Sequence, residues 1–296
     1  MPELPDVTVY VEHLARRLTG ATLERARIVS VNLLRTVEPP VAAAEGRRVT
    51  GTRRLGKRIV VAFADDLFFV FHLMIAGRFR WRTDDARLPG RIGLATFTFS
   101  TGTLLLTEAG TQQRASLHVV RGEAALAAFD PGGIEVIGAP LAAFRAALTR
   151  EDHTVKRALT DPRFVSGIGN SYSDEILHRA RLSPLKRTSR LSDDEWARLH
   201  AAAGATLTRW TDRLREETGD AFPEKVTAFR DGMAVHGRYR QPCPDCGAPV
   251  QRIVYAKHET NYCARCQTGG RLLADRARSR LLKGDWPRTL EEMEGG

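Results

Sequence analysis

The first residues of the chain place two reactive groups side by side. The sequence begins MPELPDV, so removal of Met1, which small second residues generally permit, would free the secondary amine of Pro2 next to the carboxylate of Glu3. A backbone amine titrates at about 7.7–8.0, against about 10.4 for lysine, so roughly a tenth of it is unprotonated near neutral pH. It is therefore a usable nucleophile without burial. The same pattern fits a chance start or the N-terminal proline of a tautomerase, although tautomerases are much shorter.

All four cysteines of the chain lie in one segment, as the two C-x2-C pairs Cys243/Cys246 and Cys263/Cys266. Two such pairs at this distance are a strong zinc signature, because each tight turn directs two thiolates at one point and four sulfurs complete a tetrahedron. A closed shell of four thiolates leaves no position for a catalytic water, so we expect one structural Zn²⁺. Disulfides would need an oxidising compartment, and the chain opens without a secretion signal.

The segment between the cysteine pairs has the length of a β-hairpin. The runs VQRIVYA and TNYC bracket a polar tip, KHE, that carries Lys257 and His258. Both side chains are well placed to contact a phosphate or a groove of a nucleic acid.

The charge balance points to a polyanionic partner. The chain has 45 Lys and Arg against 35 Asp and Glu, a formal net charge of +10. Nucleic acid is the first candidate for such a partner, although a protein from a GC-rich genome can also be rich in arginine. No apolar run reaches the roughly 20 residues that a membrane span needs. We expect a cytoplasmic protein, a monomer, with no membrane contact.

The secondary structure that must position these residues is predicted to change along the chain from strands to helices. The first 130 residues have the pattern of strands, with one hairpin turning at Asp65-Asp66 and another joining ATFTFS to TLLLTE. A helix from about Val7 to Leu18 precedes them. From Pro140 to about Glu217 the pattern is helical, and SDDE at 192–195 is a capping box that opens a long helix. The stretch FDPGGIEV indicates the link between the two parts.

One junction in the helical part could bind a phosphate. In VSGIGNSYSDE, Gly167 and Gly169 permit a tight turn and Asn170 opens a helix. Backbone amides and the positive end of the dipole at a helix start suit an anion. A plain turn explains the two glycines equally well.

Six motifs in one order resemble the formamidopyrimidine-DNA glycosylase and endonuclease VIII family. They are MPELPDV at the start, GKR near 57, HLMIAGR at 72–78, VSGIGN at 165–170, VHGRYRQPC at 235–243 and the cysteine finger. The resemblance implies an α+β fold with an N-terminal β-sandwich flanked by helices and a helix–two-turns–helix domain with a zinc-finger hairpin. It implies an enzyme that binds damaged double-stranded DNA in a basic cleft, removes an oxidised base and cuts the strand.

The resemblance also assigns roles to single residues. Pro2 becomes the nucleophile that attacks the sugar, Glu3 a general acid, and Lys57 a contact to the phosphate beside the lesion. Asp6 stands where the family usually has Glu. The base must leave the stack, and the wedge that fills the gap is methionine in the usual HLGMSG. In HLMIAG, Met74 has moved one place forward and Ile75 takes the wedge position. Further DNA contacts are expected from Asn170, Arg238, Lys257 and His258.

The sequence departs from the family in several places. TEAGTQQRASLHV replaces the stretch that supplies an arginine and an aromatic wedge, and Arg114 is the remaining candidate there. The segment from Glu217 to Val235 is shorter than the loop that caps oxidised guanine in purine-specific members. This shorter segment leaves the preferred lesion open. His258 replaces the usual arginine of the finger tip, which leaves the final cleavage product open. Beyond Cys266 the chain continues as a helix packed on the finger or as an extra DNA contact.

These observations predict five segments: a catalytic β-sandwich domain at 1–130, a linker at 131–138, a DNA-binding helical domain at 139–234, a zinc finger at 235–270 and an extension at 271–296. They favour a glycosylase that also cleaves the strand by β-elimination through a Pro2 Schiff base. A non-catalytic sensor of damaged or distorted DNA is the alternative. A general zinc-ribbon adaptor would leave the N-terminal motif unexplained.

Overall fold

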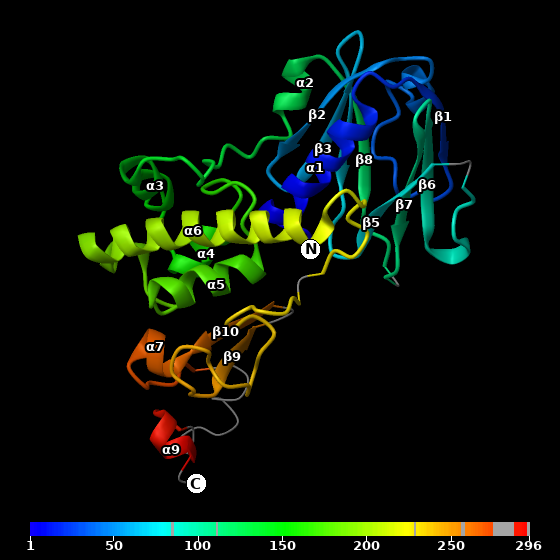
Figure 1. Cartoon of the computed structure of the whole chain (residues 1–296). Helices are drawn as coiled ribbons and strands as arrows, with labels where there is room; N and C mark the ends of the chain where they lie inside the picture. The colour runs from blue at the N-terminus through cyan, green and yellow to red at the C-terminus, as the bar shows by residue number, and fades with distance from the viewer. Residues whose placement is uncertain (84–85, 111, 228, 256–257, 275–286, 295–296) are drawn as a thin grey trace. The chain divides into compact units, whose positions relative to one another are not determined.

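A computed structural model shows two four-stranded sheets, one two-stranded sheet and a series of helices among the residues that it describes. It describes residues 1–83, 86–110, 112–227, 229–255, 258–274 and 287–294. The chain divides into two units, one of Met1–Pro131 with Trp210–Thr227 and one of Gly132–Arg209 with Ala228–Gly296 (Figure 1). Helix α6 (Asp193–Thr218) belongs to both, since its last residues lie in the first unit.

The first unit is a sandwich of two antiparallel four-stranded sheets. One has the order β1-β6-β7-β5, with bounds Leu23–Ile28, Gly93–Phe99, Gly102–Glu108 and Gly77–Arg82. The other has the order β2-β3-β4-β8, with bounds Val49–Leu55, Arg58–Phe63, Leu67–His72 and Ser116–Arg121. Their inner faces meet through aromatic rings: Phe69 lies 5.8 Å from Phe97, and Phe71 lies 5.1 Å from Phe79, between ring centroids. The predicted sandwich is confirmed.

Both predicted hairpins are present. β3 and β4 are joined by the three residues Ala64, Asp65 and Asp66, and the last two have left-handed φ of 61° and 52°, as a tight hairpin turn requires. Short helices complete the unit: the 3₁₀ helices η1 (Val41–Ala44) and η2 (Gly90–Ile92), and α2 (Glu123–Ala127).

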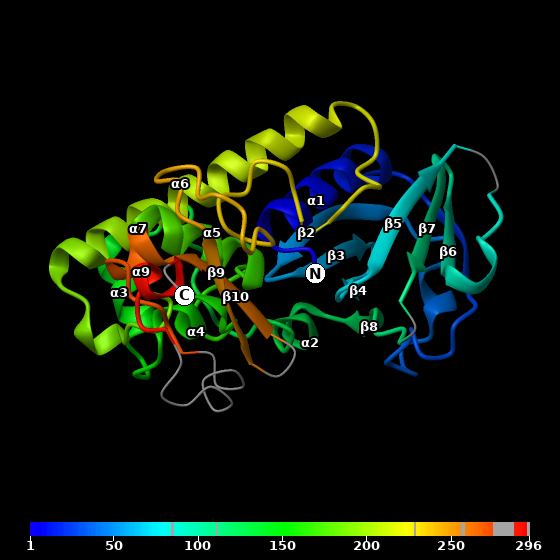
Figure 2. The same ribbon diagram turned by 90° about the horizontal axis from the view of Figure 1, so that it is seen from below.

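Helix α1 (Leu4–Leu18) lies against β2 and β3 (Figures 1 and 2). Its apolar face, with Val7, Tyr10 and Leu14, is fully buried in the core of the sandwich. The prediction that this helix begins near Val7 was wrong by three residues. Glu3 is the N-cap, and a capping box between Glu3 and Asp6 starts the helix at Leu4.

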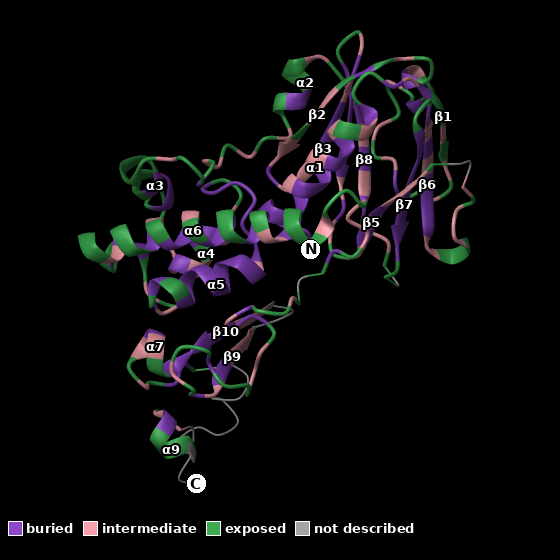
Figure 3. Ribbon diagram, in the orientation of Figure 1, coloured by how far each residue is buried: buried purple, intermediate pink, exposed green. Residues whose placement is uncertain are grey.

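The second unit contains the helices and the finger. Its elements are α3 (Leu141–Leu148), α4 (Val155–Thr160), α5 (Asn170–Ala180), η3 (Thr188–Arg190), most of α6, β9 (Val250–Tyr255), β10 (His258–Cys263), α7 (Ala264–Thr268) and α9 (Leu290–Glu294). The predicted capping box opens α6: the Ser192 amide donates to Glu195 Oε2 at 2.9 Å, and the Glu195 amide donates to Ser192 Oγ at 3.3 Å. Helix α5 is buried almost throughout (Figure 3).

The described ends of the C-terminal extension pack on the finger. Leu272, Leu273 and Leu290 are buried in one apolar cluster with Tyr262 of β10. The Leu273 amide also donates to Tyr262 Oη at 2.8 Å. The described part of the extension therefore completes the core of the finger. Among the described residues, no helix is both long enough and apolar enough to cross a membrane.

Candidate active site and zinc centre

The start of α1 holds two buried carboxylates. Glu3 is 3% exposed and Asp6 is 5% exposed. The Glu3 amide donates to Asp6 Oδ2 at 2.9 Å, and the Glu3 side chain accepts from the Asp6 amide. Negative charge at this end of a helix is favoured by the helix dipole. The capping box therefore fixes the Glu3 carboxylate beside the chain terminus.

The terminal amine lies among these carboxylates and two cations. Burial is the main reason why the pKa of the Met1 α-ammonium lies below its ordinary value. Glu3 and Asp6 oppose this by raising that pKa, while Arg78 and Lys57 lower it. Pro2 is buried at the same place. Burial at this place therefore favours the unprotonated form of the Met1 amine.

Lys57 reaches this site from a turn far along the chain. Gly56, with φ of 60°, and Lys57 form the two-residue turn between β2 and β3. Burial lowers the pKa of the Lys57 ammonium, and the charge of Glu3 raises it in part. The tertiary structure thus brings Lys57, Glu3 and the terminus within electrostatic reach of one another.

Arg78 is a site residue that the sequence reasoning missed. It is the second residue of strand β5, and its Nε donates to the Val226 carbonyl at 2.7 Å while its Nη1 donates to the Ile75 carbonyl at 3.1 Å. These bonds hold the guanidinium beside the terminal amine, whose pKa it lowers. The only sequence signal was its place at the end of HLMIAGR.

The loop between β4 and β5 separates the two wedge candidates. Met74 has a left-handed φ of 53°, and its Sδ lies 2.6 Å from His72 Nδ1. Ile75 is instead 63% exposed. Ile75 is the more exposed of the two side chains, since Met74 is half-buried.

Two of the DNA-contact residues predicted in the second unit already make hydrogen bonds within that unit. Asn170 Nδ2 donates to the Glu259 carbonyl of β10 at 2.7 Å. The guanidinium of Arg238 donates to the carbonyls of Met233 and Pro242, each at 3.2 Å. Lys257 lies outside the described residues. His258 begins β10, and its backbone alone is described.

The four cysteines converge as expected. Their Sγ atoms lie within 4.8 Å of one another, with Cys243 and Cys266 at 3.9 Å and Cys246 and Cys263 at 3.4 Å. Zn–S bonds of about 2.3 Å in a tetrahedron place sulfurs roughly 3.8 Å apart. The donor set therefore fits one structural Zn²⁺, and the expected cofactor is confirmed.

Comparison with known proteins agrees with this arrangement. The description "Formamidopyrimidine-DNA glycosylase N-terminal domain" matches residues 1–114, the H2TH domain of that enzyme matches 138–216, and "Zinc finger found in FPG and IleRS" matches 240–269. A formamidopyrimidine-DNA glycosylase of Heliobacterium modesticaldum is 31% identical, over 90% of this chain and 100% of that one. This chain belongs to the formamidopyrimidine-DNA glycosylase family.

Two further matches agree with this assignment. An uncharacterized formamidopyrimidine-DNA glycosylase-like protein of Mycobacterium tuberculosis is 39% identical over 53% of this chain and 95% of its own length. The wild-type Lactococcus lactis Fpg (MutM), solved with an oxidized-pyrimidine-containing DNA, superimposes with a TM-score of 0.80 at 25% identity, over 90% of this chain and 100% of that one. The resemblance and the α+β fold predicted from the sequence are confirmed.

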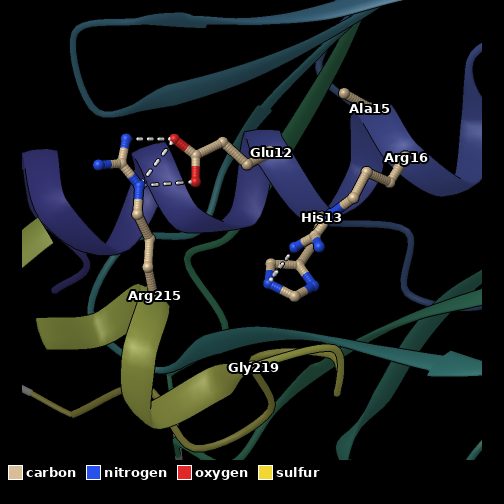
Figure 4. Close-up of a pocket in the computed structure, with 6 residues that line it drawn as sticks. All are labelled: Glu12, His13, Ala15, Arg16, Arg215 and Gly219. Carbon is tan, nitrogen blue, oxygen red and sulfur yellow. Dashed lines mark hydrogen bonds and ion pairs between the residues drawn. The ribbon is translucent and has the colours of Figure 1, made fainter. Parts of the chain in front are cut away.

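A pocket of about 490 Å³ lies against the second half of α1. Its lining residues are Glu12, His13, Ala15, Arg16, Arg215 and Gly219. Arg215 of α6 bonds Glu12 there through Nε and Nη2, the shortest distance being 2.6 Å (Figure 4). His13 is 1% exposed, and its two ring nitrogens face Arg16 at 2.8 Å and Arg17 at 3.1 Å. Burial first, and then these two guanidiniums, lower the pKa of His13 to about 4.

His13 should make the first unit acid-sensitive. Since the folded state disfavours its charged form, the unfolded chain binds the extra proton as pH falls from 6.5 towards about 4. Stability present above pH 6.5 is lost in that window. His13→Gln should remove about 2 kcal/mol of the difference in unfolding free energy between pH 7 and about pH 4.5. Urea denaturation at the two pH values measures this, and equal pH dependence in both proteins would contradict it.

Proposed function

We propose that this chain is a base-excision-repair DNA glycosylase that also cleaves abasic sites, acting on oxidised bases in damaged duplex DNA. The proposal rests on one observation: the terminal amine, Glu3 and Lys57 lie within electrostatic reach of one another near the start of α1. The named relatives are formamidopyrimidine-DNA glycosylases, and the Lactococcus lactis Fpg was solved bound to an oxidised-pyrimidine DNA. The net charge of +10 suits a nucleic-acid substrate.

The nucleophile is the amine of Pro2 after removal of Met1. Its lone pair attacks C1′ of the damaged nucleotide, and the C1′–N bond breaks as the base leaves with the electron pair and gains a proton. Glu3 gives a proton to the ring oxygen, which opens the sugar, while the amine nitrogen loses its own proton. Because proline's amine is secondary, the resulting imine has no N–H to lose and stays cationic.

That cation drives strand cleavage. It accepts the electron pair left when a C2′ proton departs, and the 3′ phosphate then leaves by β-elimination. Lys57 contacts the phosphate beside the lesion, where its charge stabilises the leaving group. Zn²⁺ in the finger would have a structural role and no catalytic one, because four cysteine thiolates leave no position for a water or a substrate.

Ile75 is the wedge that fills the gap of the flipped base, since it is exposed while Met74 is held at His72. Ile75→Ala should slow base release from duplex DNA about tenfold, because unstacking costs a few kcal/mol. Release from a single-stranded lesion should change little. Val31→Ala is the matched control, as Val31 is an 89% exposed aliphatic side chain of the same unit. A larger duplex effect from Met74→Ala would contradict this assignment.

The DNA contacts proposed for the second unit are Asn170, Arg238, Lys257 and His258. Asn170 and Arg238 already bond backbone carbonyls, so their contact to DNA would use the remaining donors. We also propose that the chain works in the cytoplasm as a monomer, in the five segments given above.

A panel of duplexes carrying different oxidised bases, scored for base release and for strand cleavage, tests the function. Release of at least one base with a cut at its site is the expected result. Tight binding of damaged duplexes with no base released from any of them would instead favour the non-catalytic sensor of damaged DNA.

A further inference from the structure

One face of α5 bonds the zinc finger along its whole length. The residues on this face lie at positions i, i+4, i+5 and i+8, which fall within one half of the helix circumference at 3.6 residues per turn. They are Asn170, Asp174, Glu175 and His178. Their finger-side partners are the Glu259 carbonyl, the Asn261 amide at 3.2 Å, the Val235 and His236 amides at 2.9 Å each, and Cys243 Sγ.

The last of these contacts reaches the zinc site itself. His178 is 3% exposed, and its Nε2 lies 3.3 Å from Cys243 Sγ, within hydrogen-bond distance for sulfur. Asp245 Oδ2 lies 4.0 Å from the same nitrogen. A zinc-bound cysteine is a thiolate with no proton to give. The imidazole must therefore be the donor in the zinc-bound protein.

We propose that His178 is a positioning residue of the zinc site, whose Nε2–H donates to the Cys243 thiolate, slows zinc release and fastens the finger to α5. Four thiolates around Zn²⁺ leave a net negative charge, and a buried donor aimed at one of them stabilises it. The same helix begins at Asn170, so the bond also ties the metal to the helix start proposed to bind DNA. The claim about zinc does not depend on the Pro2 chemistry.

The rate at which the full-length zinc-loaded protein releases zinc to a chromogenic chelator tests the proposal. His178→Leu, which removes the donor, should release zinc 10- to 100-fold faster, the range typical of lost outer-sphere partners. His178→Gln, whose Nε2 can still donate, should stay close to the wild-type rate. In the cobalt-substituted protein, the thiolate-to-cobalt charge-transfer band should shift in the leucine variant and not in the glutamine variant.

His200→Leu is the matched control, since His200 of α6 bonds the Ala139 carbonyl at 2.7 Å in the same unit and contacts no finger cysteine among the described residues. If the leucine variant of His178 does not fold, His178→Met makes the same comparison. A wild-type release rate without the donor would overturn the proposal. So would equal acceleration in the glutamine variant or in the His200 control, because either would indicate lost packing rather than a lost hydrogen bond.

Discussion

Blocking the terminal amine should abolish covalent capture of the chain on damaged DNA. Borohydride reduces the proposed Pro2 iminium to a stable bond, so the wild-type protein should be trapped on a lesion-bearing duplex. A form that keeps Met1, or that carries a short N-terminal extension, has an amide at Pro2 with no nucleophilic lone pair. It should lose at least about a hundredfold in trapping, as expected when a covalent nucleophile is removed. Pro2→Gly should lose most of its trapping as well.

The control is the same extension placed at the C-terminus, which should trap like the wild type. Digestion of the reduced adduct and mass spectrometry should place the sugar remnant on the first residue of the mature chain. An adduct mapped to Lys57 or to another internal lysine would refute the mechanism, whatever the total yield.

Glu3→Gln should separate the two chemical steps. The Glu3 carboxyl is proposed to protonate the ring oxygen of an intact nucleotide, and a positioned general acid contributes about 10²–10⁴-fold. Base release should fall by that order. Cleavage of a preformed abasic site should fall much less, because its sugar already opens to the aldehyde in water. Gel assays on the two substrates measure the ratio of the two losses.

Glu12→Gln is the matched control, because Glu12 lies on the same helix but is paired with Arg215 outside the site. It should keep both activities. Equal losses on the two substrates would argue that Glu3 acts through the capping box of α1 rather than as an acid. A comparison of melting temperatures would then show the loss of helix stability directly.

The sequence alone determined the features that depend on local spacing. The two C-x2-C pairs predicted the zinc site because ligand geometry is set within a few residues of each turn. The Asp65-Asp66 turn and the capping box at Ser192 were found because short-range backbone geometry needs particular residue types. The order of the motifs likewise indicated the family, which the comparisons confirm.

The tertiary structure decided what depends on contacts between distant residues. Arg78 joins the terminus only because the fold brings β5 beside α1. Met74 and Ile75 are both apolar in sequence, and only the structure shows that Ile75 is exposed while Met74 is half-buried with its Sδ against His72. The last residues of α6 belong to the first unit, and Leu273 is buried in the core of the finger. Periodicity reports which face of an element is apolar but not which distant surface covers it, so these contacts could not be predicted.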